Sequence, residues 1–365
     1  MITLFERYPR LAEKLSRLEF GNFPTPVEKL KGLCHRLNKD NLYIKRDDLS
    51  SQTYGGNKVR KLEFLLADAM KRGAGRIITS GGAGSNHALA TALYAKQSGL
   101  KAVLMLYQQP NSHAVQDNLL MDLYSGAKLF HHDTYEEHLR AFKETVKRYE
   151  IFDERVPYVI PLGGSSSVGA IGYVNAGFEL AEQIAAGKMP LPYRIYLALG
   201  TMGTTAGLLL GLKAAEINVH LHVVRVVPTY VANMDKCRLL FHQTNELLRE
   251  LAPSFPLCTI EPDDITIYHG YFGKKYGLFT REAMAAMALL RESDGIALDG
   301  TYTSKACAAF LENAQSSDGE PLLFWNTKNS RPSPLGALVA DYKLLPSSFH
   351  HYFTEPVQPL DKESY

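Results

Sequence analysis

Short β-rich apolar segments alternate with helical patterns along almost the whole chain, and this alternation constrains the fold more than any other feature. The predicted strands are 42–44, 76–79, 102–106, 128–130, 158–160, 194–198, 222–227 and 322–325. The predicted helices are 88–98, 113–124, 135–148, 169–186, 204–215, 234–251 and 280–292. Strands and helices that alternate in this way form parallel sheets with helices on both faces. We therefore expect an α/β protein with mostly parallel, twisted sheets.

The length of 365 residues suggests two domains, since one domain usually takes about 150 residues. Two interleaved domains are expected, because no Pro/Ser-rich linker separates two halves of the chain. We predict two three-layer αβα domains. The large, cofactor-binding domain consists of residues 1–60 plus 171–365, and residues 61–170 form a small inserted domain.

Composition excludes several classes of protein. The net charge is only +2 and the sequence has no long basic run, so neither nucleic acid nor an anionic membrane is implied as a partner. We expect a cytoplasmic protein because no apolar run approaches membrane-spanning length and charges interrupt the N-terminal segment. The four cysteines lack paired metal-ligand spacing, so we expect no metal site and a reducing compartment. They are Cys34, Cys237, Cys258 and Cys307.

A lysine, Lys58, directly follows the sequence Gly55-Gly56-Asn57 and begins a predicted helix. The apolar residues of that helix repeat at helical spacing, as Val59, Leu62, Leu66 and Ala69. The positive end of the helix dipole disfavours the charged form of a first-turn lysine, and a neutral amine suits a Schiff base. From this motif alone, a solvated lysine beside Arg60 and Lys61 is an equally good interpretation.

Two glycine-rich segments each follow a predicted strand and precede a predicted helix. In the first, Ser80–His87, the small residues and the polar Ser85, Asn86 and His87 suit a carboxylate at a helix N-terminus. It is a poor dinucleotide-binding motif, because three polar side chains stand where a Rossmann loop needs close packing. An ordinary capped glycine turn remains an alternative.

The second segment, Gly200-Thr201-Met202-Gly203-Thr204-Thr205, combines two glycines with three hydroxyl residues. Backbone N–H groups in such a segment can hold a phosphate group. It lacks the Gly-Lys-Ser/Thr ending of a nucleotide-triphosphate loop, so a single phosphate monoester is the expected ligand. A capped turn is again the alternative.

Together with 23–26, 42–49 and 301–306, these motifs resemble one family in order and spacing. The family is the pyridoxal-phosphate (PLP) enzymes of the tryptophan synthase β-subunit fold, known as fold type II. The similarity is to the branch that contains D-cysteine desulfhydrase and 1-aminocyclopropane-1-carboxylate deaminase. It covers nearly the whole chain and implies PLP as the cofactor, a small amino acid as the substrate and a homodimer.

The resemblance also implies roles for individual residues. Lys58 holds the cofactor covalently and, once released, is the base for the α-proton. The implied cofactor contacts are Asn57, Lys58, Asn86, Gly200, Thr201, Met202, Gly203, Thr204, Thr205 and Thr303. The implied substrate contacts are Ser85, Asn86, His87, Tyr271, Tyr302 and Thr327, and Ser85, Tyr271 and Tyr302 are also implied as catalytic.

Thr303 distinguishes two reactions within the branch. The deaminases carry a glutamate where Thr303 would face the pyridine nitrogen of the cofactor, and a glutamate keeps that nitrogen protonated. A neutral hydroxyl holds the proton less firmly, which favours β-elimination over cyclopropane ring opening. The chain also departs from the family pattern at Gly84, where a glutamine is usual, at Asn326–Ser330, where a His-Thr-Gly-Gly type of sequence is usual, and at Lys274 and Lys275.

We therefore predict a PLP-dependent lyase that catalyses β-elimination from a small β-substituted amino acid. D-cysteine, converted to pyruvate, ammonia and sulfide, is the first choice of substrate. The alternatives are a 1-aminocyclopropane-1-carboxylate deaminase, an L-amino-acid or cysteate sulfo-lyase, and a catalytically idle PLP- or metabolite-binding protein. A nicotinamide-dependent dehydrogenase is disfavoured because no acidic residue follows the first glycine-rich segment at the distance needed to bind a ribose.

Overall fold

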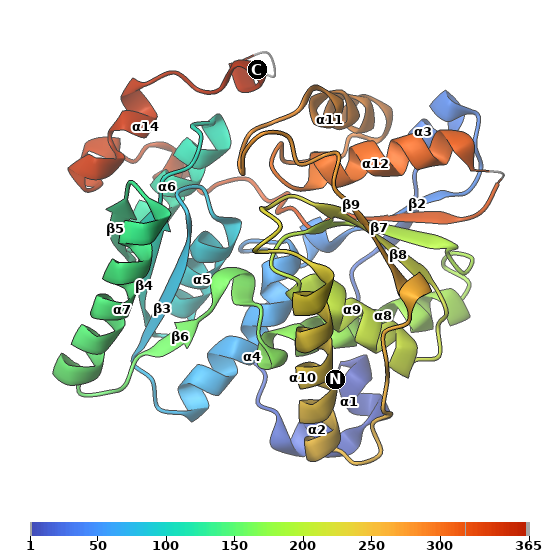
Figure 1. Ribbon diagram of the computed structural model, residues 1–365, viewed down its shortest axis with the longest axis horizontal. Helices are drawn as coiled ribbons and strands as arrows, with labels where there is room; N and C mark the ends of the chain where they lie inside the picture. The colour runs from blue at the N-terminus through green and yellow to red at the C-terminus, as the bar shows by residue number, and fades with distance from the viewer. Residues whose placement is uncertain (1, 318, 363–365) are drawn as a thin grey trace. The chain divides into compact units, whose positions relative to one another are not determined.

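A computed structural model describes residues 2–317 and 319–362, and the predicted α/β class is confirmed (Figure 1). The chain divides into two compact units. Unit 1 consists of the N-terminal residues to Leu15, Gly21–Lys61 and Ser165–Arg331. Unit 2 consists of Ser16–Phe20, Leu62–Gly164 and the chain from Pro332 onward.

These bounds differ from the predicted ones by one residue at Lys61, which belongs to unit 1, and at three longer segments. Residues 16–20 belong to unit 2, where the N–H groups of Leu18 and Phe20 donate to the carbonyl and the carboxylate of Glu63, both at 2.9 Å. Residues 165–170 belong to unit 1. The chain from Pro332 onward belongs to unit 2, where Asp361 accepts a hydrogen bond of 2.6 Å from the N–H of His113. Long-range hydrogen bonds of this kind leave no mark on local sequence patterns.

The sheet of unit 1 has the strand order β1-β2-β10-β7-β8-β9, and only β1 runs antiparallel to its neighbour. All eight predicted strands of the chain form, and seven of them begin and end within two residues of the predicted positions. Strands β1 and β9 were not predicted because both are short and mostly half-buried or exposed. The strands are β1 (Val27–Lys29), β2 (Leu42–Lys45), β7 (Arg194–Leu199), β8 (His220–Arg225), β9 (Ile265–Tyr268) and β10 (Leu322–Trp325).

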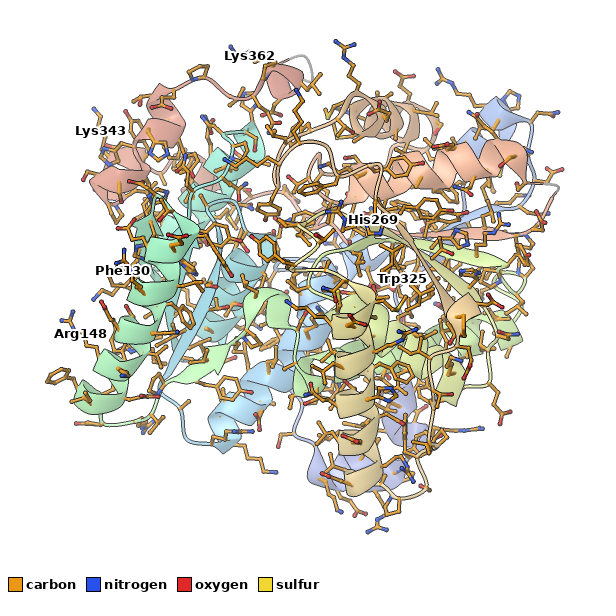
Figure 2. All side chains as sticks on the ribbon, in the orientation of Figure 1. Phe130, Arg148, His269, Trp325, Lys343 and Lys362 are labelled. Atoms are coloured by element: carbon orange, nitrogen blue, oxygen red, sulfur yellow. The ribbon has the colours of Figure 1, made fainter. Side chains whose placement is uncertain are left out.

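Helices pack on both faces of this sheet (Figure 1). Helix α12 (Thr303–Ser316) covers one face, where Phe310 packs edge-on against Tyr196 of β7 at 5.6 Å between ring centroids. On the other face Trp325 of β10, labelled in Figure 2, lies beside Tyr173 of α8 and is fully buried. The remaining helices of unit 1 are α1 (Thr3–Arg7), α2 (Pro9–Lys14), α3 (Lys31–Leu37), α8 (Ser167–Ala185), α9 (Gly203–Ala214), α10 (Met234–Leu251) and α11 (Arg281–Asp294).

Unit 2 contains a fully parallel sheet with the order β5-β4-β3-β6. Alternate strand residues face opposite ways. Val103 and Met105 of β4 pack toward α7, whose Phe142 and Val146 cover them, and α5 packs against β3 and β4. The side chain of Arg148, on α7, is exposed to solvent and points away from the sheet (Figure 2). The elements are β3 (Arg76–Gly82), β4 (Lys101–Tyr107), β5 (Lys128–His132), β6 (Tyr158–Ile160), α5 (Asn86–Gln97), α6 (His113–Ser125), α7 (Tyr135–Phe152), α13 (Leu335–Leu338), α14 (His351–Thr354) and α15 (Pro359–Lys362).

Helix α4 (Asn57–Lys71) begins in unit 1 and continues into unit 2. Its predicted apolar positions, Val59, Leu62, Leu66 and Ala69, are all fully buried. Among the residues that the structure describes, none of the helices is long and apolar enough to cross a membrane.

Candidate functional site

The two glycines before Lys58 allow the start of α4 to approach another segment of the backbone closely. Gly56 has a φ of +91°, and a Cβ atom there would lie 2.8 Å from the carbonyl oxygen of Thr327. That carbonyl accepts a hydrogen bond of 3.1 Å from the N–H of Asn57. The N–H of Gly55 donates to Oδ1 of Asn329 at 2.7 Å. The segment that departs from the family pattern, 326–330, therefore holds the beginning of α4.

Lys58 lies within this packed region of unit 1. Its Nζ donates to Oδ1 of Asn57 at 2.8 Å. Burial lowers the pKa of Lys58 from 10.5 to about 8, and the nearby carboxylate of Asp299 opposes part of that decrease. A neutral amine is therefore accessible near neutral pH, as the motif predicted, and desolvation is the main cause.

The second glycine-rich segment lies next to Lys58. Helix α9 begins at Gly203, and its N-cap residue, Met202, makes no side-chain capping hydrogen bond. Nδ2 of Asn57 donates to Oγ1 of Thr204 at 3.0 Å, which connects the neighbour of Lys58 to this helix start. A Cβ atom at Gly203 would lie 2.6 Å from Oγ of Ser165 and 2.8 Å from Nζ of Lys61. Only glycine fits at this position without displacing those polar groups.

Two residues of this region, Lys61 and Ser165, were not predicted. Nζ of Lys61 lies 3.4 Å from Oγ of Ser165. The Ser165 hydroxyl also accepts from the N–H of Gly203 at 3.1 Å and lies 2.8 Å from Oγ1 of Thr201. Lys61 is only 2% exposed, and burial, followed by the charge of Lys58, holds its pKa well below the usual range. The spacing from Lys58, i to i+3, could have indicated that both lysines share one helix face.

These features fit a phosphate group. The hydroxyl of Thr205 is buried and has no hydrogen-bond partner among the residues that the structure describes. A helix N-terminus whose N-cap residue makes no side-chain capping bond, a buried hydroxyl without a partner and a buried lysine together match the donors that bound phosphates use. Gly200 has open space around its Cβ position. The residues that are present can therefore hold the phosphate monoester of PLP.

Tyr271 and Tyr302 are the two tyrosines predicted for the active site. The hydroxyl of Tyr271 donates to Glu312, and its ring packs against Tyr268. The hydroxyl of Tyr302 instead lies 2.5 Å from that of Tyr276. Burial, followed by the influence of Tyr302, raises the pKa of Tyr276 well above the usual range. Tyr276, which was not predicted, is therefore the tyrosine that contacts Tyr302, and the role of Tyr271 stays a prediction.

Thr303 begins α12 and is fully buried, and its partner Asp299 was not predicted. Oγ1 of Thr303 donates to Oδ2 of Asp299 at 2.7 Å. The carboxylate of Asp299 also accepts from the N–H groups of Thr301, Tyr302 and Thr303 at 3.0, 2.6 and 3.2 Å. Asp299 therefore caps α12, a role that residue type alone would have assigned to Thr303 itself.

The first glycine-rich segment belongs to unit 2. Ser85 is the N-cap of α5, with its Oγ accepting from the N–H of Ala88 at 3.2 Å. Oδ1 of Asn86 accepts from Nδ2 of Asn118 at 2.9 Å. His87 is buried, and its Nε2 lies 2.9 Å from Oγ1 of Thr79. The three polar side chains therefore stand together around one helix N-terminus.

Gly84, the departure within that segment, has a structural explanation. A Cβ atom at this position would lie 2.7 Å from Cγ2 of Val115 and 3.1 Å from Nε2 of Gln109. The N–H of Gly84 donates to Oε1 of Gln109 at 3.1 Å. The amide of Gln109 occupies the space that a longer residue at position 84 would need.

A buried charge cluster supports the start of α4 from within unit 1. Arg60 is 1% exposed and binds the carboxylates of Asp47 at 2.7 Å and Glu179 at 2.8 Å. Nζ of Lys45 binds Glu179 at 2.5 Å. Removing one charged residue from such a cluster leaves another buried charge without its compensating partner. The N–H of Gly56 also donates to the carbonyl of Asp47 at 2.9 Å, so the cluster is connected to the loop before Lys58.

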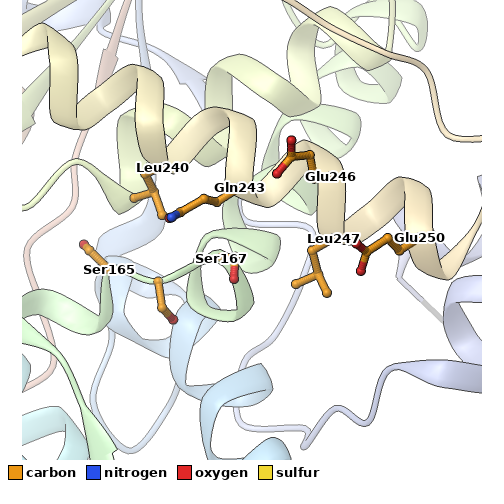
Figure 3. A pocket seen from close by; sticks show the side chains of 8 residues that line it. Ser165, Ser167, Leu240, Gln243, Glu246, Leu247 and Glu250 are labelled. Atoms are coloured by element: carbon orange, nitrogen blue, oxygen red, sulfur yellow. The ribbon is translucent and has the colours of Figure 1, made fainter.

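An open groove of about 500 Å³ lies between the N-terminus of α8 and α10 (Figure 3). Ser165, Ser166 and Ser167 line one side, and Glu246 and Glu250 line the other. Those carboxylates disfavour an anion, so the phosphate region described above is the better candidate. Among the described residues, no group of three His, Cys, Asp or Glu side chains could hold a metal ion.

Comparison with known proteins agrees with this geometry. Residues 18–327 match the family described as pyridoxal-phosphate dependent enzyme. A D-cysteine desulfhydrase of Yersinia enterocolitica is 36% identical over 319 residues, which are 85% of this chain and 93% of the relative.

Two solved structures are also similar. One is described as an ACC deaminase homologue, with a TM-score of 0.75, 31% identity and coverage of 89% of this chain and 94% of that one. A threonine deaminase from Solanum lycopersicum has a TM-score of 0.60 at 15% identity, with coverage of 92% and 89%, and shows the fold alone. The chain is therefore a member of the pyridoxal-phosphate dependent enzyme family and has its type II fold.

Proposed function

We propose that this PLP-dependent lyase catalyses β-elimination from D-cysteine, with pyruvate, ammonia and sulfide as products. The observation that carries the proposal is the half-buried amine of Lys58, with its lowered pKa, whose neighbour Asn57 contacts the start of α9 at Thr204. This arrangement suits a cofactor that has both an aldehyde and a phosphate. The D-cysteine desulfhydrase relative supports this choice of substrate.

Residues of unit 1 would hold the cofactor. Lys58 would bind it covalently, and Gly200–Thr205 with Lys61 and Ser165 would bind its phosphate. Thr303 would face the ring nitrogen. When bound, PLP supplies an electron sink for the negative charge that develops at the α-carbon of the substrate.

Other side chains would move protons and orient the substrate. The released Lys58 amine, with its lowered pKa, would accept the α-proton near neutral pH. Tyr302 and its partner Tyr276 would exchange protons at the substrate. Ser85, Asn86 and His87 would bind the substrate carboxylate, since their helix N-terminus favours an anion. Thr327, next to the start of α4, would complete the substrate contacts.

A second candidate reaction is opening of 1-aminocyclopropane-1-carboxylate. The solved structure described as an ACC deaminase homologue, at 31% identity, is the observation that favours it. Release of ammonia without sulfide distinguishes this reaction from β-elimination of a thiol. An L-amino-acid lyase or a cysteate sulfo-lyase would differ in the accepted stereoisomer or in releasing sulfite.

The test is an assay of the purified protein with D-cysteine, L-cysteine, cysteate and 1-aminocyclopropane-1-carboxylate. Pyruvate, ammonia, sulfide and sulfite are each measured. We expect sulfide and pyruvate from D-cysteine, with turnover lost in Lys58→Ala and retained in Lys71→Ala, which changes an exposed lysine of the same helix. Efficient turnover of the cyclopropane without turnover of D-cysteine would reverse the choice of substrate, and turnover of none would favour an idle binding protein.

We further propose a cytoplasmic homodimer. The four cysteines are buried free thiols, which suits a reducing compartment. The homodimer follows from the family resemblance, and sedimentation of the purified protein measures it directly.

A further inference from the structure

The hydroxyl of Thr303 has a fixed orientation, and this orientation determines what it can offer to a ligand. A threonine hydroxyl has one proton and two lone pairs. Oγ1 of Thr303 lies 2.7 Å from Oδ2 of Asp299 and accepts from the N–H of Asp299 at 2.9 Å. An ionised carboxylate can only accept, so the hydroxyl proton must point to Asp299. One lone pair on Oγ1 is then left for a further partner.

The surroundings of Asp299 support its ionised state. Besides the Thr303 hydroxyl, three backbone N–H groups donate to its two oxygens, those of Thr301, Tyr302 and Thr303. All of these groups donate a hydrogen bond to the carboxylate, and together they occupy about the four lone-pair positions that it has. The carboxylate also lies at the N-terminus of α12, a helix of 14 residues, where the helix dipole favours a negative charge.

We propose that Asp299 is a positioning residue that makes Thr303 a hydrogen-bond acceptor toward the cofactor, so that the ring nitrogen stays protonated. The inference rests on the proposed function, in which Thr303 faces that nitrogen. A hydroxyl whose proton is committed to Asp299 cannot donate to a bare pyridine nitrogen, but its remaining lone pair can accept from a pyridinium N–H. The negative charge of the carboxylate, one hydrogen bond away, favours the same protonated form.

This inference revises the interpretation drawn from residue type. A neutral threonine was expected to hold the ring proton weakly and thereby to favour β-elimination. Because its proton points to Asp299, the Thr303 hydroxyl accepts a hydrogen bond from the ring nitrogen, as the glutamate of the deaminases would, and does not donate one as an isolated alcohol could. Ring protonation then does not separate the two reactions, and their difference must arise among the residues that contact the substrate.

The test uses PLP that carries ¹⁵N in its ring, bound to the full-length protein, because protonated and unprotonated pyridine nitrogens have well-separated chemical shifts. We expect the protonated shift in the wild type and in Thr303→Ser, which retains the hydroxyl. In Asp299→Asn the amide can donate to Oγ1, which frees the hydroxyl proton for the ring, so we expect the unprotonated shift. Thr303→Val should give the unprotonated shift as well.

Controls separate this effect from misfolding. Thr303→Val retains Asp299 and the backbone contacts that cap α12, so it decides the question if Asp299→Asn fails to fold. Asp294→Asn makes the same change at a carboxylate that caps α3 through Gly32 and Leu33, and it should keep the wild-type shift. An unprotonated nitrogen in the wild type, or a protonated one in Thr303→Val or in folded Asp299→Asn, overturns the inference. A wild type that shows no bound ¹⁵N signal fails the proposed function itself, and the inference with it.

Discussion

Replacing Lys61 with methionine is expected to weaken PLP binding by about 10- to 150-fold. Nζ of Lys61 lies beside Ser165 and close to the Cβ position of Gly203, at the start of α9. A hydrogen bond to a charged group contributes about 1.5–3 kcal/mol, and about 1.4 kcal/mol corresponds to a tenfold change in affinity. Methionine preserves most of the buried volume, so the loss should come from the charge.

The same substitution should stabilise the protein without cofactor. The pKa of Lys61 in the folded protein lies well below its ordinary value of 10.5, because burial disfavours the ammonium. The unfolded chain therefore binds more protons, and stability rises with pH between the lowered folded pKa and the unfolded one. In Lys61→Met this contribution to the rise disappears.

The assay combines fluorescence titration of the apo-protein with PLP and thermal unfolding between pH 6 and about pH 10, below the ordinary pKa of 10.5 that bounds this linkage from above. Lys71→Met, at the exposed end of the same helix, is the matched control and should behave as the wild type in both measurements. The reasoning is refuted if Lys61→Met binds PLP as tightly as the wild type, or if its apo-protein is less stable with an unchanged pH dependence.

Three further predictions concern packing, proton transfer and buried charge. Gly203→Ala should weaken PLP binding by about tenfold or more, which is ~1.4 kcal/mol, because the added Cβ displaces polar groups of the phosphate region. Gly270→Ala, which adds a Cβ in open space, should leave binding unchanged, and titration of both apo-proteins with PLP checks this. Tyr276→Phe should lower kcat by about 10²-fold, the lower end for a lost proton-transfer group, while Tyr271→Phe stays close to wild type. Equal effects of the two changes in steady-state assays would contradict a proton-transfer role for the pair Tyr276 and Tyr302. Arg60→Met should lower the free energy of unfolding by about 3–5 kcal/mol in urea titrations, since the buried Asp47 loses its ion-pair partner and Glu179 loses one of two. A change below about 1 kcal/mol would show that the cluster does not contribute in this way.

Local patterns were sufficient for the parts of the fold that bury continuous apolar runs. The segment Leu322–Trp325 forms a central strand because all of its residues are apolar and buried on both faces of a parallel sheet. By contrast, β9 is mostly half-buried, so its pattern does not stand out from a loop. The chain from Pro332 onward was assigned to the wrong unit because its contacts, such as that of Asp361 with His113, span more than two hundred residues.

The candidate site likewise has residues that local sequence patterns could predict and residues that only the fold brings together. The motifs that contain Lys58 and Gly203 could be recognised because glycine is needed wherever backbone or polar groups approach closely. Tyr271 and Tyr276 lie in the same loop, and only the fold determines which of them faces Tyr302. Lys61 was not predicted as part of the site because Ser165, which its amine contacts, is distant in sequence.

The most direct test of the account is to identify the lysine that binds PLP. The protein is reduced with borohydride in the presence of PLP, digested, and mapped by mass spectrometry. Two other lysines, Lys61 and Lys305, are buried and have lowered pKa values. The pKa of Lys305 is about 8, as for Lys58. Each of these two lysines therefore competes with Lys58 for reaction with PLP. The account predicts that the label lies on Lys58, and a label on Lys61 or Lys305 with Lys58 unmodified would contradict it.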